Sequence, residues 1–167
     1  MLPPDLAMLT LDTLGLDSPI SLSTAGETIY ERAAKIIERD GDMSPVVFLF
    51  TDSAVYLMES SQFFSTVARQ NELAWVIRKL THEEDDIICV AVATQGYKNS
   101  ENEEAEELLV VQCEWYDGSQ RMFSGTVRRD TPDGASGATV IGPAVVDSYP
   151  GIFSTLFSPT KQGGLLN

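Results

Sequence analysis

The chain has 167 residues, of which 43% are hydrophobic and 22% charged, a balance typical of a globular protein with one hydrophobic core. Its 25 acidic and 11 basic side chains give a formal charge of −14, which repels phosphate backbones and anionic lipid surfaces. We therefore expect neither nucleic acid nor a membrane among its partners. We interpret residues 1–167 as a single domain.

The cysteine content indicates a reducing compartment. Cys89 and Cys113 are the only cysteines, and both lie inside predicted strands. Two cysteines do not form a disulfide framework, so we expect buried, reduced thiols in a cytoplasmic protein. A disulfide between them is the alternative if the two strands are neighbours in register. No apolar run approaches the roughly 20 residues that a membrane helix needs.

The first 23 residues form an apolar arm that contains prolines and glycine and has no sustained period. Two packing modes are open for this arm: it folds back on its own domain, or it is buried against a second subunit. Its large apolar residues are Leu2, Leu6, Met8, Leu9, Leu11, Leu14 and Leu16.

We expect an α+β core over residues 24–146, and a helix begins it. Thr24 with Glu27 fits a capping box, with Thr24 as the N-cap, and the helix is predicted to run to about Arg39. The pair Asp40-Gly41 is expected to end the helix. An apolar stripe at spacings of three and four predicts the buried side of the helix: Ile29, Ala33, Ile36 and Ile37.

Two strands and a second helix follow. Residues 46–50 form a continuous apolar run, which favours a strand covered on both faces, and residues 54–58 form its hairpin partner. Ser60 or Ser61 is the expected N-cap of a helix near residues 62–80. Its predicted stripe is Phe63, Val67, Ala74 and Ile77, widened by Phe64, Trp75 and Leu80.

The third strand covers residues 87–93, and the polar segment 95–106 is predicted to be an exposed, mobile loop that holds no metal. A hairpin then spans residues 107–129 around Asp117-Gly118. A three-residue loop with Gly118 left-handed pairs Trp115 with Ser119 and Val111 with Phe123. It also places the large apolar residues on one buried face: Leu109, Val111, Cys113, Trp115 and Phe123.

Residues 139–146 are predicted to form a sixth strand at the edge of the sheet, because Pro143 cannot take a central position. Residues 147–167 are a C-terminal tail. This tail carries a second apolar surplus, and as for the N-terminal arm, packing on its own domain and packing on a second subunit are both open. Its large apolar residues are Ile152, Phe153, Leu156 and Phe157.

The expected fold is therefore α+β, with a mostly antiparallel five- to six-stranded sheet, two main helices and the order α-β-β-α-β-β-β. Strands and helices do not alternate as they do in a doubly wound parallel sheet. Over roughly residues 24–129 this element order resembles that of profilin-like and roadblock-type α+β domains. The resemblance implies a five-stranded antiparallel sheet set against helices and a role as a binding or dimerising platform. It carries over no functional residue.

His82 is the only histidine, and Glu83, Glu84, Asp85 and Asp86 follow it. A histidine oriented by a carboxylate is a possible general base, but we expect this one to be a solvent-exposed residue that is dispensable to the fold. The chain has neither the cysteine and histidine spacing of a zinc site nor a calcium loop, a nucleophile elbow or a phosphate-binding loop. We expect no catalytic, cofactor-binding or metal-ligating residue, and no cofactor.

The sequence thus favours a non-enzymatic binding or assembly module whose partner is another protein or a second copy of the chain, a homodimer. One alternative is a small enzyme or ligand-binding domain that uses an acidic rim near His82. That rim would combine residues 83–86 with the second acidic segment, residues 101–107. The other alternative is an acidic regulatory or chaperone-like partner of a basic protein.

Overall fold

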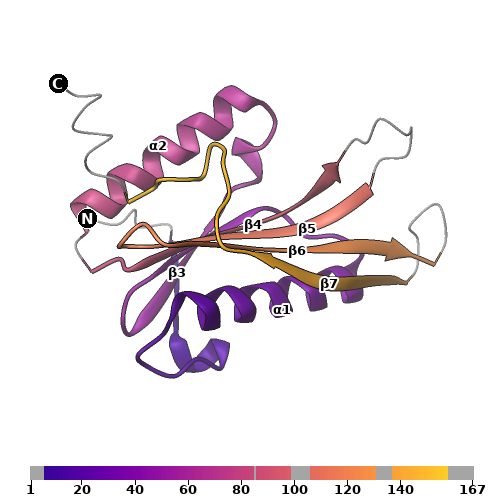
Figure 1. Cartoon of the computed structure of the whole chain (residues 1–167), viewed down its shortest axis with the longest axis horizontal. Coiled ribbons are helices and arrows are strands. Elements are labelled where there is room, and N and C mark those ends of the chain that lie inside the picture. The colour runs from indigo at the N-terminus through magenta and orange to yellow at the C-terminus, as the bar shows by residue number, and fades with distance from the viewer. Residues whose placement is uncertain (1–5, 85, 99–105, 131–136, 158–167) are drawn as a thin grey trace.

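In the computed structural model of the chain, residues 6–84, 86–98, 106–130 and 137–157 are described, and within them seven strands form one sheet between two α-helices (Figure 1). The strand order is β1-β3-β2-β4-β5-β6-β7, and every neighbouring pair is antiparallel. The expected α+β class is confirmed. The elements are β1 (Ala7–Thr10), a 3₁₀ helix (Leu11–Leu14), α1 (Leu22–Asp40), β2 (Val46–Phe50), β3 (Ala54–Glu59), a 3₁₀ helix (Ser61–Phe63), α2 (Val67–Glu83), β4 (Cys89–Lys98), β5 (Glu106–Trp115), β6 (Gln120–Arg129) and β7 (Ala138–Val146).

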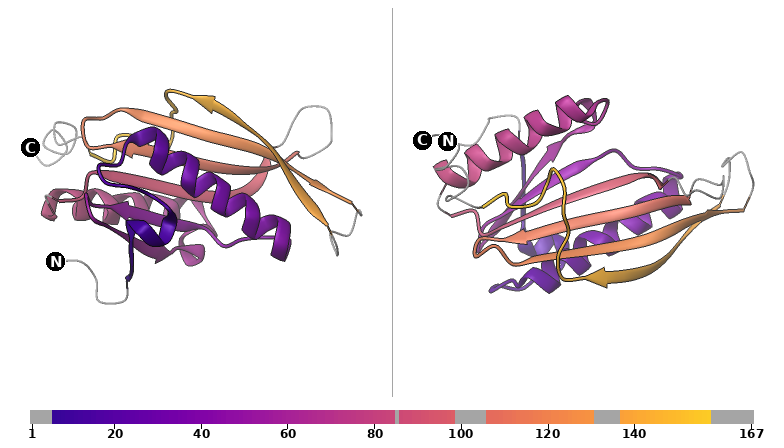
Figure 2. Two further views of the ribbon diagram at one scale, coloured as in Figure 1. Left: turned by 90° about the horizontal axis from the view of Figure 1, so that it is seen from below. Right: turned by 45° about the horizontal axis from the view of Figure 1, so that its top comes forward.

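The two helices lie on opposite faces of the sheet (Figures 1 and 2). Because side chains alternate along a strand, each face has its own core. The α1 face buries Val111 and Phe123, and the α2 face buries Val90 and Leu49. None of the helices among the described residues is long and apolar enough to span a membrane.

The sheet has one strand more than expected, because part of the N-terminal arm joins it. β1 pairs with β3, with Leu9 opposite Val55. The residues that follow β1, Leu11, Leu14 and Leu16, are buried against the core on the α1 face. The described part of the arm therefore packs on its own chain. A strand of four residues is too short to show a period in the sequence.

Helix α1 begins earlier than the sequence predicts. Its N-cap is Ser21: the N–H of Thr24 donates to Ser21 Oγ at 3.1 Å, and the N–H of Ser21 donates to Thr24 Oγ1 at 3.0 Å. The prediction of Thr24 as N-cap with Glu27 is wrong. With Ser21 as the N-cap, Ile20 precedes the cap and Ala25 lies in the first turn of the helix, and both side chains are buried. These are the two positions of a hydrophobic staple. Gly41, at φ 92°, ends the helix as expected.

Helix α2 begins later than predicted, with Thr66 as its N-cap. Ser60 instead precedes the short 3₁₀ helix, where it is buried and its hydroxyl donates to the carbonyl of Met58 at 2.8 Å. The predicted stripe is also partly wrong: Val67 and Trp75 are more than 60% exposed. The side that packs on the sheet consists of Leu73, Ala74, Ile77 and Leu80.

The predicted register of the central hairpin is confirmed. Val111 pairs with Phe123, the N–H of Trp115 donates to the carbonyl of Ser119, and Gly118 is left-handed at φ 93°. Leu109, Val111, Cys113 and Phe123 are fully buried on the α1 face, and Trp115 packs against them partly buried. The two cysteines are free and buried, as expected.

The segment between β4 and β5 is more ordered at its ends than predicted. β4 extends to Lys98, and β5 begins at Glu106, so the prediction of a loop from residue 95 is wrong there. Gln95 is held in place because it accepts the N–H of Met43 at 2.9 Å and donates to Glu107 at 2.5 Å. Residues 99–105 lie outside the described part of the chain.

β7 forms the edge of the sheet, as predicted, with a register shift where Gly142 and Pro143 stand opposite Gly125. After β7, residues 147–157 cross the sheet to α2 (Figure 2). Phe153 and Leu156 are buried beneath α2 there. The described part of the tail therefore also packs on its own chain.

Candidate functional site

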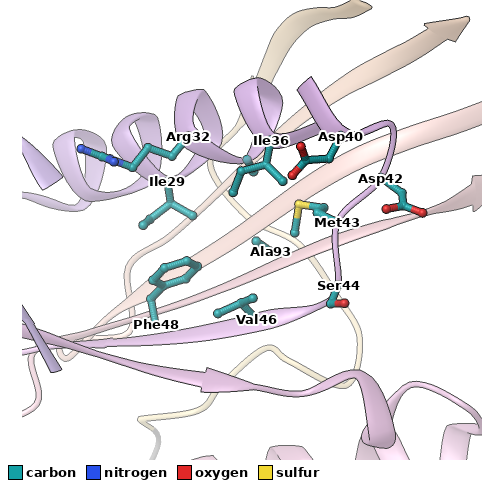
Figure 3. Close-up of a pocket in the computed structure, with 11 residues that line it drawn as sticks. Ile29, Arg32, Ile36, Asp40, Asp42, Met43, Ser44, Val46, Phe48 and Ala93 are labelled. Carbon is teal, nitrogen blue, oxygen red and sulfur yellow. The ribbon is translucent and has the colours of Figure 1, made fainter. Parts of the chain in front are cut away.

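Helix α1 covers only part of its face of the sheet. It packs on β4, β5, β6 and β7, whereas β2, β3 and β1 extend beyond it on the same side. Phe48, Leu57 and Leu9, which lie on these three strands, are only partly buried against the core. An open groove therefore runs beside α1, with β2 as its floor (Figure 3).

The groove has a volume of about 330 Å³ and a mostly apolar lining. This volume lies at the lower end of the range of about 300–1,000 Å³ found for ligand sites in proteins. Met43 and Ser44, from the loop after α1, close one end (Figure 3). The floor and the α1 wall consist of Val46, Phe48, Ala93, Ile29, Ala33 and Ile36.

Ile36 lies at the mouth of the groove. The expectation that it is buried with Ile37 is wrong, because its exposed fraction is 37% whereas that of Ile37 is 0%. Adjacent residues on a helix point about 100° apart, so only Ile37 meets the sheet. The side chain of Ile36 is therefore available to contact a bound molecule.

Opposite charges lie at the two ends of the groove (Figure 3). Arg32 stands at one end, where its guanidinium donates to the carbonyl of Thr13 at 2.8 Å. Asp40 and Asp42 stand at the other end. Asp40 is paired with Arg39 at 2.8 Å. Asp42 makes no ion pair within 4 Å with any described residue, but its charge is near enough to help raise the pKa of Arg129. The groove therefore has a positive end at Arg32 and a negative end at Asp42.

A partly buried polar network supports the loop that forms the negative end of the groove. Arg129 donates to both carboxylate oxygens of Glu107, at 2.9 and 2.7 Å, and to the carbonyl of Gly41 at 2.7 Å. Gln95 links Glu107 to Met43. The hydrogen bonds from Arg129 hold the pKa of Glu107 below its usual value. Because these residues lie on strands β4, β5 and β6, the sheet itself positions the groove's end wall.

The described residues of the two acidic segments considered for an acidic rim lie far apart, and Asp85 and residues 101–105 are outside the described part of the chain. Glu83, Glu84 and Asp86 precede the start of β4, and Glu106 and Glu107 pair with its last residues. β4 spans Cys89–Lys98, so its ends are separated by about 30 Å at the usual strand rise. His82 is exposed in the last turn of α2, on the other side of the sheet from the groove. Among the described residues, no three acidic, histidine or cysteine side chains lie close enough together to hold a metal ion.

The thiols are poorly suited to nucleophilic chemistry. Burial raises the pKa of Cys113 to about 12 and also raises the pKa of Cys89. Both thiols therefore stay protonated at neutral pH, and the thiolate is the reactive form. Their position in the sheet assigns them to core packing.

A second buried polar cluster lies under the C-terminal segment, on the α2 face. Glu114 is fully buried and accepts hydrogen bonds from Gln120 at 3.1 Å and from the N–H of Phe157 at 2.8 Å. Tyr149 lies in the same region, and burial, together with the charge of Glu114, raises the pKa of its hydroxyl. The residues of this cluster hold the C-terminal segment against the sheet. Glu114 was not singled out from the sequence, because β5 continues through it without any local signal.

Comparison of the chain with protein-family models, with curated proteins and with solved structures finds no match. The candidate site therefore depends on geometry alone. The groove residues were missed as a set because they come from α1, the following loop, β2 and β4, which are far apart in the sequence. The adjacent isoleucines Ile36 and Ile37 were the one sequence feature that could have indicated the groove. A single buried stripe of a helix does not accommodate both, so one of them had to lie outside the core.

Proposed function

We propose that this protein is a non-enzymatic binding module that takes an apolar segment of a protein partner into the groove between α1 and β2. The observation that carries the proposal is the open apolar groove, with Ile36 exposed at its mouth and a charge at each end. Apolar surface of this kind on a highly charged protein is typical of an interaction site. The carboxylate of Asp42 at one end of the groove and the net charge of −14 favour a partner that is basic near the docked segment.

Two further features support a binding role. His82 is exposed and both thiols are buried, so the described residues most capable of acid–base or nucleophilic chemistry do not converge on the groove. The element order resembles that of profilin-like and roadblock-type domains, which act as binding or dimerising platforms. With reduced cysteines, we place the protein in the cytoplasm.

Photo-crosslinking tests this function. A photoreactive amino acid replaces Ile36 at the groove, and in a matched control it replaces Trp75, which is 61% exposed on the opposite side of the molecule. We expect an adduct with a specific protein only from position 36. The purified partner should then bind the wild type at least about tenfold more tightly than Ile36→Glu, because burying a charge in an apolar contact is costly. Equal binding to Ile36→Glu and to the wild type would refute a role for the groove.

The β7 edge favours self-association as a second candidate function. The nine residues of this strand carry no charge, and Ile141, Val145 and Val146 are 44–48% exposed. Edge strands normally carry charges that prevent pairing. One outward N–H, that of Val140, is covered by Glu38 at 2.9 Å, so pairing between copies would use the segment from Ala144 to Val146.

Sedimentation analysis tests self-association through β7. We expect the wild type to form dimers as its concentration rises, and Val145→Lys to stay monomeric, because a lysine on the edge strand opposes pairing. Trp75→Lys is the matched control and should dimerise like the wild type. A wild type that stays monomeric at its highest soluble concentration would exclude this candidate.

A further inference from the structure

We infer that the occupant of the groove is an amphipathic α-helix of the partner protein, lying antiparallel to α1, with a basic residue near its N-terminal end. The inference rests on the proposed function and names the kind of segment that the groove takes. Three features of the groove support it: the hydrogen bonding of its walls, its shape and its charges.

The walls of the groove offer a bound segment no backbone partners. β2 forms the floor and is paired along its length with β3 on one side and with β4 on the other. The second wall is a helix, whose backbone groups bond internally. A segment in the groove therefore finds no backbone partner in these walls, which favours an α-helix, whose N–H and C=O groups bond internally, over an extended peptide.

The shape of the groove suits a helix packed beside α1. Arg32 and Asp40 mark its two ends and lie about 12 Å apart along the helix axis, a little more than two turns. Two packed helices have axes about 8–10 Å apart, which would place the second helix over β2 and β3. There it would cover Phe48 and Leu57, the partly buried side chains that α1 leaves open.

The charges of the groove select one direction for the bound helix. The end with Asp42 also receives the C-terminal end of α1, which carries partial negative charge. The N-terminal end of a bound helix is partially positive and is attracted there, and its negative C-terminal end is attracted to Arg32. Both attractions favour an antiparallel arrangement with α1. A lysine or arginine close to the N-terminal end of the helix would pair with Asp42.

The test is a selection from a displayed library of random 18-residue peptides on the immobilised full-length protein. We expect the selected peptides to carry apolar residues at positions i, i+3 or i+4, and i+7, with a basic residue at the N-terminal end. Synthetic versions should gain helical circular dichroism on binding. They should bind Ile36→Glu at least about tenfold more weakly than the wild type and Trp75→Glu as tightly as the wild type. Matching melting temperatures of the two variants would establish that both are folded.

A spin label at either end of a selected peptide tests the orientation. A label at the N-terminal end should broaden the amide signals of Asp42 and Met43, and a label at the C-terminal end should broaden that of Arg32.

Asp42→Lys should weaken binding, and exchanging the peptide's basic residue for glutamate should restore it. Peptides that depend on Ile36 but bind in an extended form or in the opposite direction would overturn this inference and leave the proposed function standing. If no selected peptide depends on Ile36, both are wrong.

Discussion

At the scale of single residues, the ion pair of Glu107 and Arg129 has the clearest structural role. Its side chains are only 11% and 21% exposed, and it joins β5 and β6 to the loop after α1. An ion pair shielded in this way and bonded through two parallel hydrogen bonds is stronger than one on the surface. The ion pair therefore stabilises the loop after α1, which forms the negative end of the groove.

We predict that Glu107→Gln lowers the free energy of unfolding at pH 7 by about 1–3 kcal/mol, because a charge-assisted pair is lost. The folded-state pKa of Glu107 is below its unfolded value, so its contribution is fully present above the unfolded pKa of about 4.3. The contribution is lost as the pH falls through the folded-state pKa. Urea unfolding of both proteins at pH 7 and near pH 3 measures this difference, which should shrink at the lower pH.

The matched control for this prediction is Asp40→Asn, which breaks the ion pair with Arg39. That pair is 49% and 73% exposed, and solvent screens exposed ion pairs, so its loss should cost less stability than the loss of the Glu107 pair. If Asp40→Asn costs as much stability as Glu107→Gln, burial is not what gives the Glu107 pair its strength.

At the scale of elements, the starts of both helices show how side chains compete for a cap. Serines and threonines occur in clusters before each helix, so the sequence offers several N-caps. In the structure, Ser21 and Thr66 are the N-caps, and other hydroxyls in these clusters make different hydrogen bonds. Ser60, for example, is buried with its hydroxyl on Met58 and its N–H on Pro45.

We predict that Thr66→Ala lowers the free energy of unfolding by about 1 kcal/mol, because the N–H of Arg69 loses its acceptor. Ser61→Ala, at one of the two N-cap positions predicted from the sequence, should change the free energy of unfolding by less than about 0.5 kcal/mol. Chemical denaturation of the two variants measures the difference. The reverse order of effects would mean that α2 starts earlier than the structure shows.

At the scale of the whole molecule, the two chain ends complete the core. The described N-terminal residues add β1 and bury leucines on the α1 face, and residues 147–157 fill the space between α2 and the sheet. Arg78 and Thr81 of α2 donate hydrogen bonds to the carbonyls of Ser154 and Leu156, at 3.2 and 3.0 Å. The C-terminal segment therefore acts as part of the α2 layer.

We predict that Leu156→Ala lowers the free energy of unfolding by about 2–5 kcal/mol, because Leu156 is 1% exposed and its loss leaves a cavity under α2. Val67→Ala, at a position of α2 that is 65% exposed, should change it by less than about 0.5 kcal/mol. Thermal and urea unfolding of both variants give these values. A small effect of Leu156→Ala would show that the C-terminal segment does not contribute to the folded core.

The local parts of the fold were predictable from the sequence. The register of the central hairpin followed from Asp117-Gly118 and from the alternation of apolar residues, and the edge position of β7 followed from Pro143. The burial of both cysteines followed from their place inside apolar strands. These features depend on turn chemistry and on the two-residue period of a strand, which act between residues close in the sequence.

Only the tertiary structure decided which elements meet and what they leave uncovered. Contacts between distant segments determine that β1 pairs with β3 and that Glu114 is buried. They also determine that Val67, Trp75 and Ile36 are exposed. The groove has the same origin, because it exists where α1 stops covering the sheet. An amphipathic pattern records which side of a helix is apolar, but the placement of the helix on the sheet results from packing across the whole domain.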